Sequence, residues 1–343
     1  MVDASSRLGE APRLLVARTD RIGDLVLSLP VFASLRRRWP RAHIAALTRS
    51  YGRELLEGRA DVDQIIAFDA PTAHIPAGEI RRIAGKIRAG RFDAAVVLYS
   101  NFTVALTVAL GGVPIRIGPA TKLAQIFLTH RVTQRRAHGA RHEADHNLDL
   151  LAPLGVGPVR EAIIPVTPAP RRSSNQPVIG VHPGHGGSSR NWPESNWAEL
   201  IRSLTGAGAL VVITGSPAER ELAERINRMA GGAAQLYIGE RGLMALAAEL
   251  AAMDVFIASS TGPLHIASAT GTPVVGVYCP ITVCLPERWG PIGPHDTALR
   301  PDVPPCPECV GGRCEYYDCM ERVTVEQVRD AALAKVKITA GAS

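Results

Sequence analysis

Short apolar runs alternate with helical patterns along almost the whole chain, and the alternation restarts once in its middle. Alternating strands and helices predict parallel sheets whose strands are joined by right-handed crossovers. We therefore expect an α/β protein with two Rossmann-like domains facing a cleft and a C-terminal helix. The predicted strands are 14–17, 43–47, 64–68, 94–98 and 114–117, then 178–181, 210–214, 235–238, 255–258 and 274–278.

Helical periodicity fills the intervals between the predicted strands. The predicted helices are 24–38, 50–58, 77–89, 102–110 and 143–154, then 194–204, 217–229, 243–251, 263–269 and 325–336. A stretch rich in Pro and Gly separates the two halves and is typical of an exposed linker. The expected organisation is a disordered N-terminus (1–12), a first Rossmann-like domain (13–155), a linker (156–177), a second Rossmann-like domain (178–325) and a C-terminal helix and tail (326–343).

Composition restricts where such a chain works and what it binds. The 343 residues are 46% hydrophobic and 20% charged, as in soluble globular proteins. No apolar run is long enough to span a bilayer and the N-terminus is not a signal peptide, so we expect a cytoplasmic protein. The formal charge of +6 is concentrated in residues 36–41 and in helix 77–89. Such clusters favour an anionic nucleotide, glycolipid or membrane surface, although ordinary solvated helix faces have the same composition. No nucleic-acid recognition motif is present, so a nucleic-acid partner is not expected.

The segment after the first predicted strand contains the first candidate site. A polar loop with Arg18 and Asp20 leads through Gly23 to Asp24, where a helix begins. Glycine permits close backbone approach, and ligands gather at the carboxyl ends of strands in α/β sheets. Asp24 is therefore a candidate catalytic carboxylate; the alternative is that it simply caps the helix.

A second candidate site follows the strand at 255–258. Ser259, Ser260, Thr261 and Gly262 lead into a helix with Pro263 in its first turn, and His265 lies one turn further on. Helix N-termini bind phosphates, although a plain capped helix with a buried His has the same pattern.

Two more loops at strand ends support a nucleotide ligand. The glycine-rich loop 182–193 contains Ser188, Ser189 and Arg190, which suit a phosphate. Glu219 follows another strand, where a carboxylate is suited to ribose hydroxyls. The convergence of three such loops in one half predicts a nucleotide-type ligand more strongly than any one loop does.

Taken together, these motifs resemble glycosyltransferase family 9, the lipopolysaccharide heptosyltransferases. The resemblance covers nearly the whole chain. The matching residues are Arg18, Asp20, Ile22, Gly23, Asp24 and Pro30; Arg190, Trp192 and Pro193; Thr261, Gly262 and His265; 272–275; and the cysteine-containing tail 306–320.

The resemblance implies a GT-B fold, in which domain 13–155 binds the acceptor and domain 178–325 binds the nucleotide sugar. It also implies inverting sugar transfer from that nucleotide sugar, typically ADP-heptose, to an acidic glycolipid such as the lipopolysaccharide core. It also implies that no cofactor or catalytic metal is required and that the enzyme works at the inner face of the inner membrane. Asp24 would be the general base, and Arg18, Asp20 and Gly23 would contact the acceptor. The donor residues implied are Ser188, Ser189, Arg190, Glu219, Leu243, Met244, Ser260, Thr261, Gly262 and His265.

Ser260 and Arg190 depart from the family pattern. Many members have Asp before the Thr-Gly pair, whereas this chain has Ser260, which forms only neutral hydrogen bonds. The donor sugar could therefore differ from the usual heptose. Arg190 stands where the family has Lys, so a planar fork replaces a point charge.

Two metal-type patterns also occur. Residues 142–146 match the H-E-x-x-H motif of zinc proteases, but no third ligand is evident, and the family has a polar helix here. Cys306, Cys309, Cys314 and Cys319 have spacings compatible with a structural zinc site or with reduced structural thiols. The function expected is thus a metal-independent glycosyltransferase. The alternatives are a nucleotide-sugar epimerase of the same fold and a non-catalytic nucleotide-sugar-binding protein.

Overall fold

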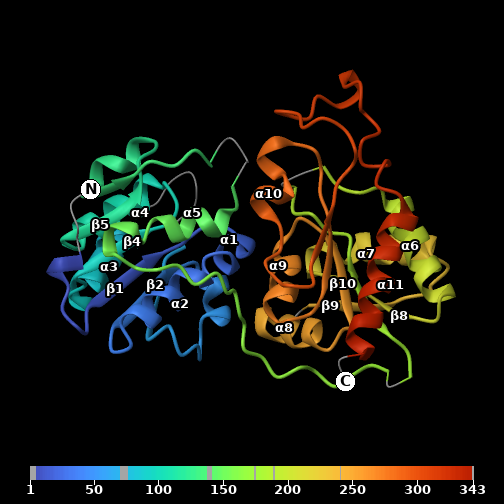
Figure 1. The fold of residues 1–343 in the computed structure, drawn as a ribbon, viewed down its shortest axis with the longest axis horizontal. Coiled ribbons are helices and arrows are strands. Elements are labelled where there is room, and N and C mark those ends of the chain that lie inside the picture. Colours follow the sequence, from blue (N-terminus) through green and yellow to red (C-terminus); the bar gives the residue numbers. More distant parts are fainter. Residues whose placement is uncertain are drawn as a thin grey trace. The chain divides into compact units, whose positions relative to one another are not determined.

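The computed structural model describes residues 5–69, 76–136, 141–173, 175–187, 190–239 and 241–341, and the chain forms two compact units (Figure 1). Unit 1 comprises Met1–Arg136 and Glu143–Ala162, and unit 2 comprises Ala137–His142 and Ile163–Ser343. Of the segment 1–12 that was predicted to be disordered, residues 1–4 lie outside the described ranges. Within the rest, Ser5–Arg7 form a short 3-10 helix, η1.

Unit 1 is built on a six-stranded parallel sheet with the strand order β3-β2-β1-β4-β5-β6. Its strands are β1 (Arg13–Ala17), β2 (His43–Thr48), β3 (Gln64–Ala67), β4 (Ala94–Val97), β5 (Ile115–Pro119) and β6 (His130–Val132). Its α-helices are α1 (Ile22–Val26), α2 (Leu29–Arg38), α3 (Ala77–Gly90), α4 (Phe102–Leu110) and α5 (Glu143–Asp149). The 3-10 helices are η2 (Ser50–Leu55), η3 (Leu123–Phe127) and η5 (Ala152–Leu154).

Unit 2 repeats this topology with the order β12-β11-β10-β7-β8-β9. Its strands are β7 (Val178–His182), β8 (Leu210–Gly215), β9 (Gln235–Ile238), β10 (Val255–Ser259), β11 (Val274–Val277) and β12 (Thr297–Leu299). Its α-helices are α6 (Glu194–Gly206), α7 (Arg220–Met229), α8 (Leu243–Ala251), α9 (Gly262–Ala269), α10 (Pro286–Trp289) and α11 (Val325–Gly341). The 3-10 helices are η6 (Pro217–Glu219), η7 (Thr282–Cys284) and η8 (Gly311–Arg313).

Both sheets have the order 3-2-1-4-5-6 of a Rossmann fold when their strands are counted along the chain. The predicted α/β class with two Rossmann-like halves is therefore confirmed. In this topology ligands bind outside the carboxyl ends of the strands where the strand order reverses. That point lies between β1 and β4 in unit 1 and between β7 and β10 in unit 2.

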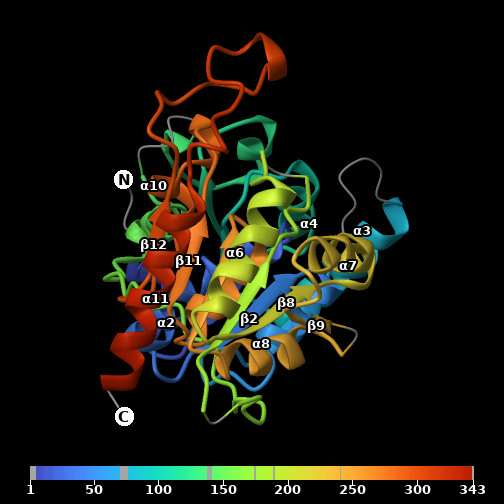
Figure 2. The same ribbon diagram turned by 90° about the vertical axis from the view of Figure 1, so that its right-hand side faces the viewer.

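The core of unit 2 includes the motif residue Trp192. Its ring is buried and meets Trp197 of α6 edge to face, with 5.0 Å between ring centroids. Its indole N–H donates to the carbonyl of Val323, just before α11. Helix α11 then packs alongside α6, as Figure 2 shows. Trp192 thus attaches the loop after β7 to the C-terminal segment.

Several predicted elements differ from those observed. The predicted helix 24–38 is two helices, because Pro30 has no N–H to donate to the carbonyl four residues earlier and the helix restarts after Ser28. Residues 50–58 are mostly a 3-10 helix, and Pro153 lies in η5, beyond the end of α5. The edge strands β6 and β12 were not predicted, since three residues give too little periodicity. Within the described ranges, no helix has the length and apolar character needed to cross a bilayer.

Candidate functional site

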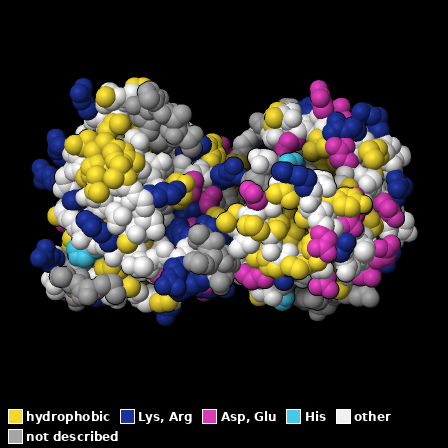
Figure 3. Space-filling model, turned by 90° about the horizontal axis from the view of Figure 1, so that it is seen from above, with side chains coloured by type: hydrophobic (Ala, Val, Ile, Leu, Met, Phe, Trp, Pro, Cys, Tyr) yellow, Lys and Arg dark blue, Asp and Glu magenta, His cyan; other side chains and the backbone are white. Residues whose placement is uncertain are grey.

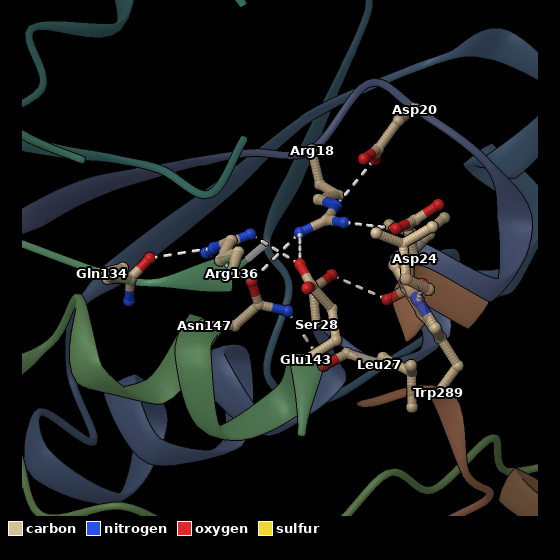
Figure 4. A network of polar contacts seen from close by, with 12 residues as sticks. Arg18, Asp20, Asp24, Leu27, Ser28, Gln134, Arg136, Glu143, Asn147 and Trp289 are labelled. Atoms are coloured by element: carbon tan, nitrogen blue, oxygen red, sulfur yellow. Dashed lines mark hydrogen bonds and ion pairs between the residues drawn. The ribbon is translucent and has the colours of Figure 1, made fainter. Parts of the chain in front are cut away.

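Four polar side chains, two from the segment after β1 and two from α5, meet one buried guanidinium. Arg18 is 2% exposed; its Nε donates to Asp20 Oδ1 at 2.7 Å and one terminal nitrogen donates to Asp24 Oδ1 at 2.5 Å. The other terminal nitrogen contacts Glu143 Oε1 at 3.2 Å and Asn147 Oδ1 at 3.0 Å, both from α5 (Figure 4). Burial opposes the charge of Arg18, but the three carboxylates raise its pKa above the ordinary value. Arg18 is therefore a fixed cation at the switch point of unit 1.

Arg136 is a second cation beside Glu143. One of its terminal nitrogens lies 2.5 Å from Glu143 Oε1, and its Nε donates to Gln134 at 2.9 Å. The cluster thus joins two arginines to three carboxylates. Burial raises the pKa of Asp20 to about 6; Arg18 lowers that pKa, and the neighbouring Asp24 carboxylate raises it. Asp20 therefore exchanges its proton near pH 6.

Asp24 is the third residue of α1 rather than its cap. The N-cap position is Arg21, without a side-chain cap hydrogen bond, so the capping interpretation is wrong. The Asp24 side chain is 13% exposed. Arg18 holds Oδ1, whereas no described residue donates a hydrogen bond to Oδ2. Asp24 therefore presents an oriented carboxylate with one oxygen available to a substrate.

The backbone of the loop is also held in place. Arg49 Nε donates to the carbonyl of Thr19 at 2.8 Å, and the Tyr51 hydroxyl donates to that of Asp20 at 2.5 Å. Tyr99 follows β4 across the switch point, with its ring centroid 6.0 Å from the Arg18 guanidinium carbon. Sequence reasoning identified Arg18, Asp20, Gly23 and Asp24 but missed these partners, because they come from distant parts of the chain.

Glu143 has a structural role that explains part of the H-E-x-x-H pattern. It is buried and ion-paired with both Arg18 and Arg136. Among the residues that the structure describes, no three His, Cys, Asp or Glu side chains converge on a possible metal position. The arrangement therefore does not support a metalloprotease.

In unit 2, the N-terminus of α9 presents two buried polar atoms without partners. Thr261 is the N-cap residue, and its hydroxyl forms no cap hydrogen bond. Thr261 Oγ1 and, one turn later, His265 Nδ1 are buried and have no hydrogen-bond partner among the described residues. Burial, and to a lesser extent His142, lowers the pKa of His265 to about 3, so the imidazole is neutral. Unpaired buried polar atoms are costly unless a ligand satisfies them, which favours a ligand here.

The ends of β7 and β8 meet at a tightly packed contact. His182 Nδ1 lies 3.0 Å from the Thr214 hydroxyl, and its Nε2 lies 3.9 Å from Glu219 Oε1. Burial lowers the pKa of His182, and the nearby Glu219 carboxylate opposes this effect. Burial raises the pKa of Glu219, but His182 and two hydrogen bonds from Ser216 lower it below its usual value. A Cβ on Gly184 would lie 2.0 Å from Glu219 Oε1, so any larger residue here would force the Glu219 carboxylate to move.

Ser260, the residue that departs from the family pattern, hydrogen-bonds to Tyr278. The Tyr278 hydroxyl in turn donates to the carbonyl of Trp289 at 2.8 Å. Ser260 therefore supports the β11 end of unit 2 through this bond, a role that the sequence did not indicate.

Arg190 is directed to the C-terminal loop in this structure. Its guanidinium donates to the carbonyl of Tyr317 and lies 3.6 Å from the Cys319 sulfur. Leu243 and Met244 are half-buried at the start of α8, after Gly242. Ser188 and Ser189 lie outside the described residues.

The C-terminal cysteines are free thiols. Cys306, Cys309, Cys314 and Cys319 are not disulfide-bonded, and they do not form one of the metal-type groups sought among the described residues. Cys279, just after β11, and Cys284, in η7, are hydrogen-bonded to each other. That bond lowers the pKa of the Cys279 thiol to about 6.

The fold and these loops define a two-unit Rossmann-type protein with ligand groups at the carboxyl ends of both sheets. Residues 80–317 match the family model "Glycosyltransferase family 9 (heptosyltransferase)". The chain therefore belongs to glycosyltransferase family 9 and is a glycosyltransferase. The matched range includes α9 and Arg190 but begins after Asp24.

Relatives and solved structures agree with this family. A putative glycosyltransferase of Haemophilus influenzae is 32% identical, over 83% of this chain and 87% of its own length. Lipopolysaccharide heptosyltransferase 2 of Escherichia coli K12 is 26% identical, over 78% of this chain and 83% of its own length. The crystal structure of a family 9 glycosyl transferase from Veillonella parvula has a TM-score of 0.81 at 21% identity, covering 96% of this chain and all of that one. The structure of E. coli ADP-heptose lps heptosyltransferase II has a TM-score of 0.76 at 22% identity and covers 95% of this chain and 99% of its own.

Proposed function

We propose that this glycosyltransferase is an inverting, metal-independent heptosyltransferase of lipopolysaccharide biosynthesis. It would transfer heptose from ADP-heptose to a lipopolysaccharide-core or related acidic glycolipid, in the cytoplasm at the inner membrane face. The names of the E. coli relative and of the E. coli structure, a lipopolysaccharide heptosyltransferase and an ADP-heptose lps heptosyltransferase, support this substrate class.

The observation that carries the proposal is the Arg18–Asp24 pair. A general base must be ionised, oriented and within reach of the proton that it removes. Arg18 fixes one oxygen of Asp24, and the other oxygen is not hydrogen-bonded by any described residue. Asp24 Oδ2 would accept the proton of the acceptor hydroxyl, while Arg18, Asp20 and Gly23 shape the acceptor side.

The bond changes follow from this assignment. The acceptor oxygen forms its bond to the anomeric carbon as the bond from that carbon to the diphosphate oxygen breaks. Attack opposite the leaving group inverts the anomeric centre. The bonding electrons leave with ADP, and the acceptor proton goes to Asp24.

Unit 2 would stabilise the charge that develops on ADP. The N-terminus of α9 offers backbone N–H groups and a positive dipole end, and within the described part of the chain Thr261 Oγ1 and His265 Nδ1 have no hydrogen-bond partner. We assign the diphosphate to this end, with Gly262 allowing close approach. Ser188, Ser189 and Arg190 would assist, but Arg190 would first have to leave the Tyr317 carbonyl. Glu219 would bind ribose, and the backbone at Leu243 and Met244 would contact the base. Ser260 would lie beside the sugar.

The test is Asp24→Asn, which keeps the shape of the side chain and removes its basicity. With ADP-heptose and a deacylated lipopolysaccharide-core acceptor, kcat should fall by roughly 10²- to 10⁴-fold. ADP affinity, measured by calorimetry, should stay within about twofold. Glu57→Gln, a change in an exposed carboxylate on the same unit, should leave both unchanged.

Other outcomes would reject the proposal. Retained turnover in Asp24→Asn would exclude Asp24 as the base. Product formed from the nucleotide sugar without an acceptor would indicate an epimerase. Binding of ADP-heptose without transfer to any core acceptor would indicate a non-catalytic binding protein.

A further inference from the structure

Unit 1 exposes a group of large apolar side chains beside the Arg18 cluster. Tyr99, Phe102, Leu110, Leu123 and Ile126 form what we call the α4–η3 surface; Leu123 is 64% exposed and Ile126 54%. Phe102 packs edge to face on Phe127, with ring centroids 5.1 Å apart, so α4 and η3 are joined. Figure 3 shows a broad hydrophobic area on the upper face of this unit. Contiguous exposed apolar patches mark interaction sites.

The sequence of α4 explains why this surface is apolar. Val104, Ala105 and Val108 are buried against the rest of unit 1. Phe102 and Leu110 lie two turns apart on the outer face, with half-buried Leu106 between them. The solvent side of a surface helix normally carries polar residues. The apolar outer side of α4 is therefore a candidate surface for binding a partner.

The surroundings of the surface are strongly cationic. Residues 76–136 contain two lysines and eight arginines but only Glu79 and Asp93 as acids. Exposed Lys122 immediately precedes η3, and Arg88 donates to the carbonyl of Leu110 at the end of α4. Further exposed cations on α3 and near β6 are Arg81, Arg82, Lys86, Arg131 and Arg135. An apolar centre with basic surroundings complements an anionic lipid bilayer. A second copy of the chain would bring like charges together.

The surface also lies at the functional end of the sheet. Tyr99 follows β4 and η3 follows β5, so both lie beyond the carboxyl ends of strands, as Arg18 does. The Tyr99 ring is 5.4 Å from the Lys122 ammonium and 6.0 Å from the Arg18 guanidinium carbon. A lipid-linked molecule held at this surface would therefore have its polar head on the side of unit 1 that contains Asp24.

We propose that the α4–η3 surface binds an anionic lipid bilayer, with Phe102, Leu110, Leu123 and Ile126 entering the boundary between headgroups and acyl chains. Lys122 and its neighbouring cations bind the headgroups. This inference rests on the proposed function only where it explains access to a lipid-linked acceptor; bilayer binding itself is separately measurable.

The experiment is vesicle flotation of the full chain. The vesicles are phosphatidylethanolamine with one quarter phosphatidylglycerol, or phosphatidylcholine alone as the neutral comparison. The test variant is Leu123→Ser with Ile126→Ser. The control is Met229→Ser with Val310→Ser, which removes two exposed apolar side chains from unit 2. Circular dichroism and melting temperature check that each variant is folded.

We expect the wild type and the control to float with anionic vesicles and to bind neutral vesicles weakly. The test variant should bind anionic vesicles about tenfold less well. Transfer to a deacylated, water-soluble acceptor should be unchanged, while KM for an acceptor embedded in vesicles should rise.

The proposal is overturned if the wild type does not float with anionic vesicles, or if the test variant floats as well as the wild type. It is also overturned if light scattering shows an oligomer that the test variant converts to monomers without any change in flotation. Flotation that depends on Leu123 and Ile126, without transfer to any acceptor, would reject the proposed function and leave the bilayer surface standing. Sugar transfer to an acceptor without flotation would reject the bilayer surface and leave the proposed function standing.

Discussion

The guanidinium of Arg18 holds the carboxylate of Asp24 at 2.5 Å and, from its other terminal nitrogen, reaches Glu143 and Asn147 on α5. The polar segment between β1 and α1 is thereby held by one buried cation. The orientation of Asp24 depends on a residue that need not touch the substrate at all.

Replacing Arg18 by Lys should separate orientation from charge. A single ammonium cannot reach all four partners, so Glu143 loses part of its compensation while buried. We expect the free energy of unfolding to fall by about 2–4 kcal/mol and kcat to fall at least about tenfold, with ADP affinity unchanged. Urea unfolding and steady-state kinetics measure these effects. Arg36→Lys, a multiply bonded arginine of α2, should retain kcat.

The pH dependence of stability should reveal the proton on Asp20. Its pKa is about 6 in the folded protein, against an ordinary value of 3.8. Between these values the folded state keeps a proton that the unfolded state has lost, so the free energy of unfolding decreases as pH rises. Over pH 4.5–6.5 this contribution is about 1–2 kcal/mol. The difference between wild type and Asp20→Asn, measured by denaturant unfolding across this range, should change in that direction; a constant difference would contradict the raised pKa.

His265 should have the opposite effect. Its folded pKa of about 3 lies below the ordinary 6.5, so from pH 7 to 5 only the unfolded state gains a proton. The free energy of unfolding therefore falls as pH falls, by about 2 kcal/mol at pH 5. His265→Gln should lose this component. Parallel pH profiles of the variant and the wild type would show that the imidazole is not held neutral.

Gly184→Ala should disturb the contact between the β7 and β8 ends. The added Cβ would lie 2.0 Å from Glu219 Oε1 and 3.0 Å from His182 Nε2. The carboxylate must move away from Ser216, which we expect to lower the free energy of unfolding by about 1–3 kcal/mol and to weaken ADP binding. Gly206→Ala is the matched control: its Cβ meets nothing within 4 Å, so stability should be equal or slightly higher. Thermal melts with and without ADP would show both.

Tyr278→Phe and Ser260→Ala should act as a pair. The two hydroxyls are hydrogen-bonded, so Tyr278→Phe removes the partner of Ser260, whereas in Ser260→Ala the Tyr278 hydroxyl keeps its bond to the Trp289 carbonyl. A double-mutant cycle should give a coupling of about 1 kcal/mol in the free energy of unfolding. If the effects of the two substitutions on the free energy of unfolding were strictly additive, Ser260 would not be coupled to Tyr278 and its hydroxyl would be available to the donor sugar.

Local pattern was sufficient for most of the sheet architecture. The strands are buried apolar runs, and their alternation with helices leads to the Rossmann order. Pro30 could have indicated the break between α1 and α2, since proline has no N–H to continue the helical hydrogen bonds. We predicted one continuous helix because the apolar periodicity across Leu25, Leu29 and Phe32 continues past the break. The edge strands β6 and β12 have three residues each, too few for a sequence pattern. They form because they pair with β5 and β11, the neighbouring strands of their sheets.

The candidate sites were predictable as loops but not as networks. Gly23 and Asp24 stood out because a strand, a polar turn and a helix follow each other locally. Glu143 and Asn147 could not be connected to Arg18, since contacts across more than a hundred residues arise only from the tertiary fold. Similarly, the charge of Arg190 and its place in a glycine-rich loop suggested a phosphate ligand. In the fold, its guanidinium instead donates to the backbone carbonyl of Tyr317 in the C-terminal loop.

The dependence of Arg18 on α5 has a consequence for biosynthesis. The ribosome releases the first strand long before residues 143 and 147, so the nascent N-terminal sheet has a guanidinium without its full set of partners. Until α5 emerges, that cation is satisfied only by water and its near neighbours, which favours an open loop. A chain stalled or cleaved before residue 143 should therefore expose this end of the sheet to proteases, even where the earlier strands have already paired.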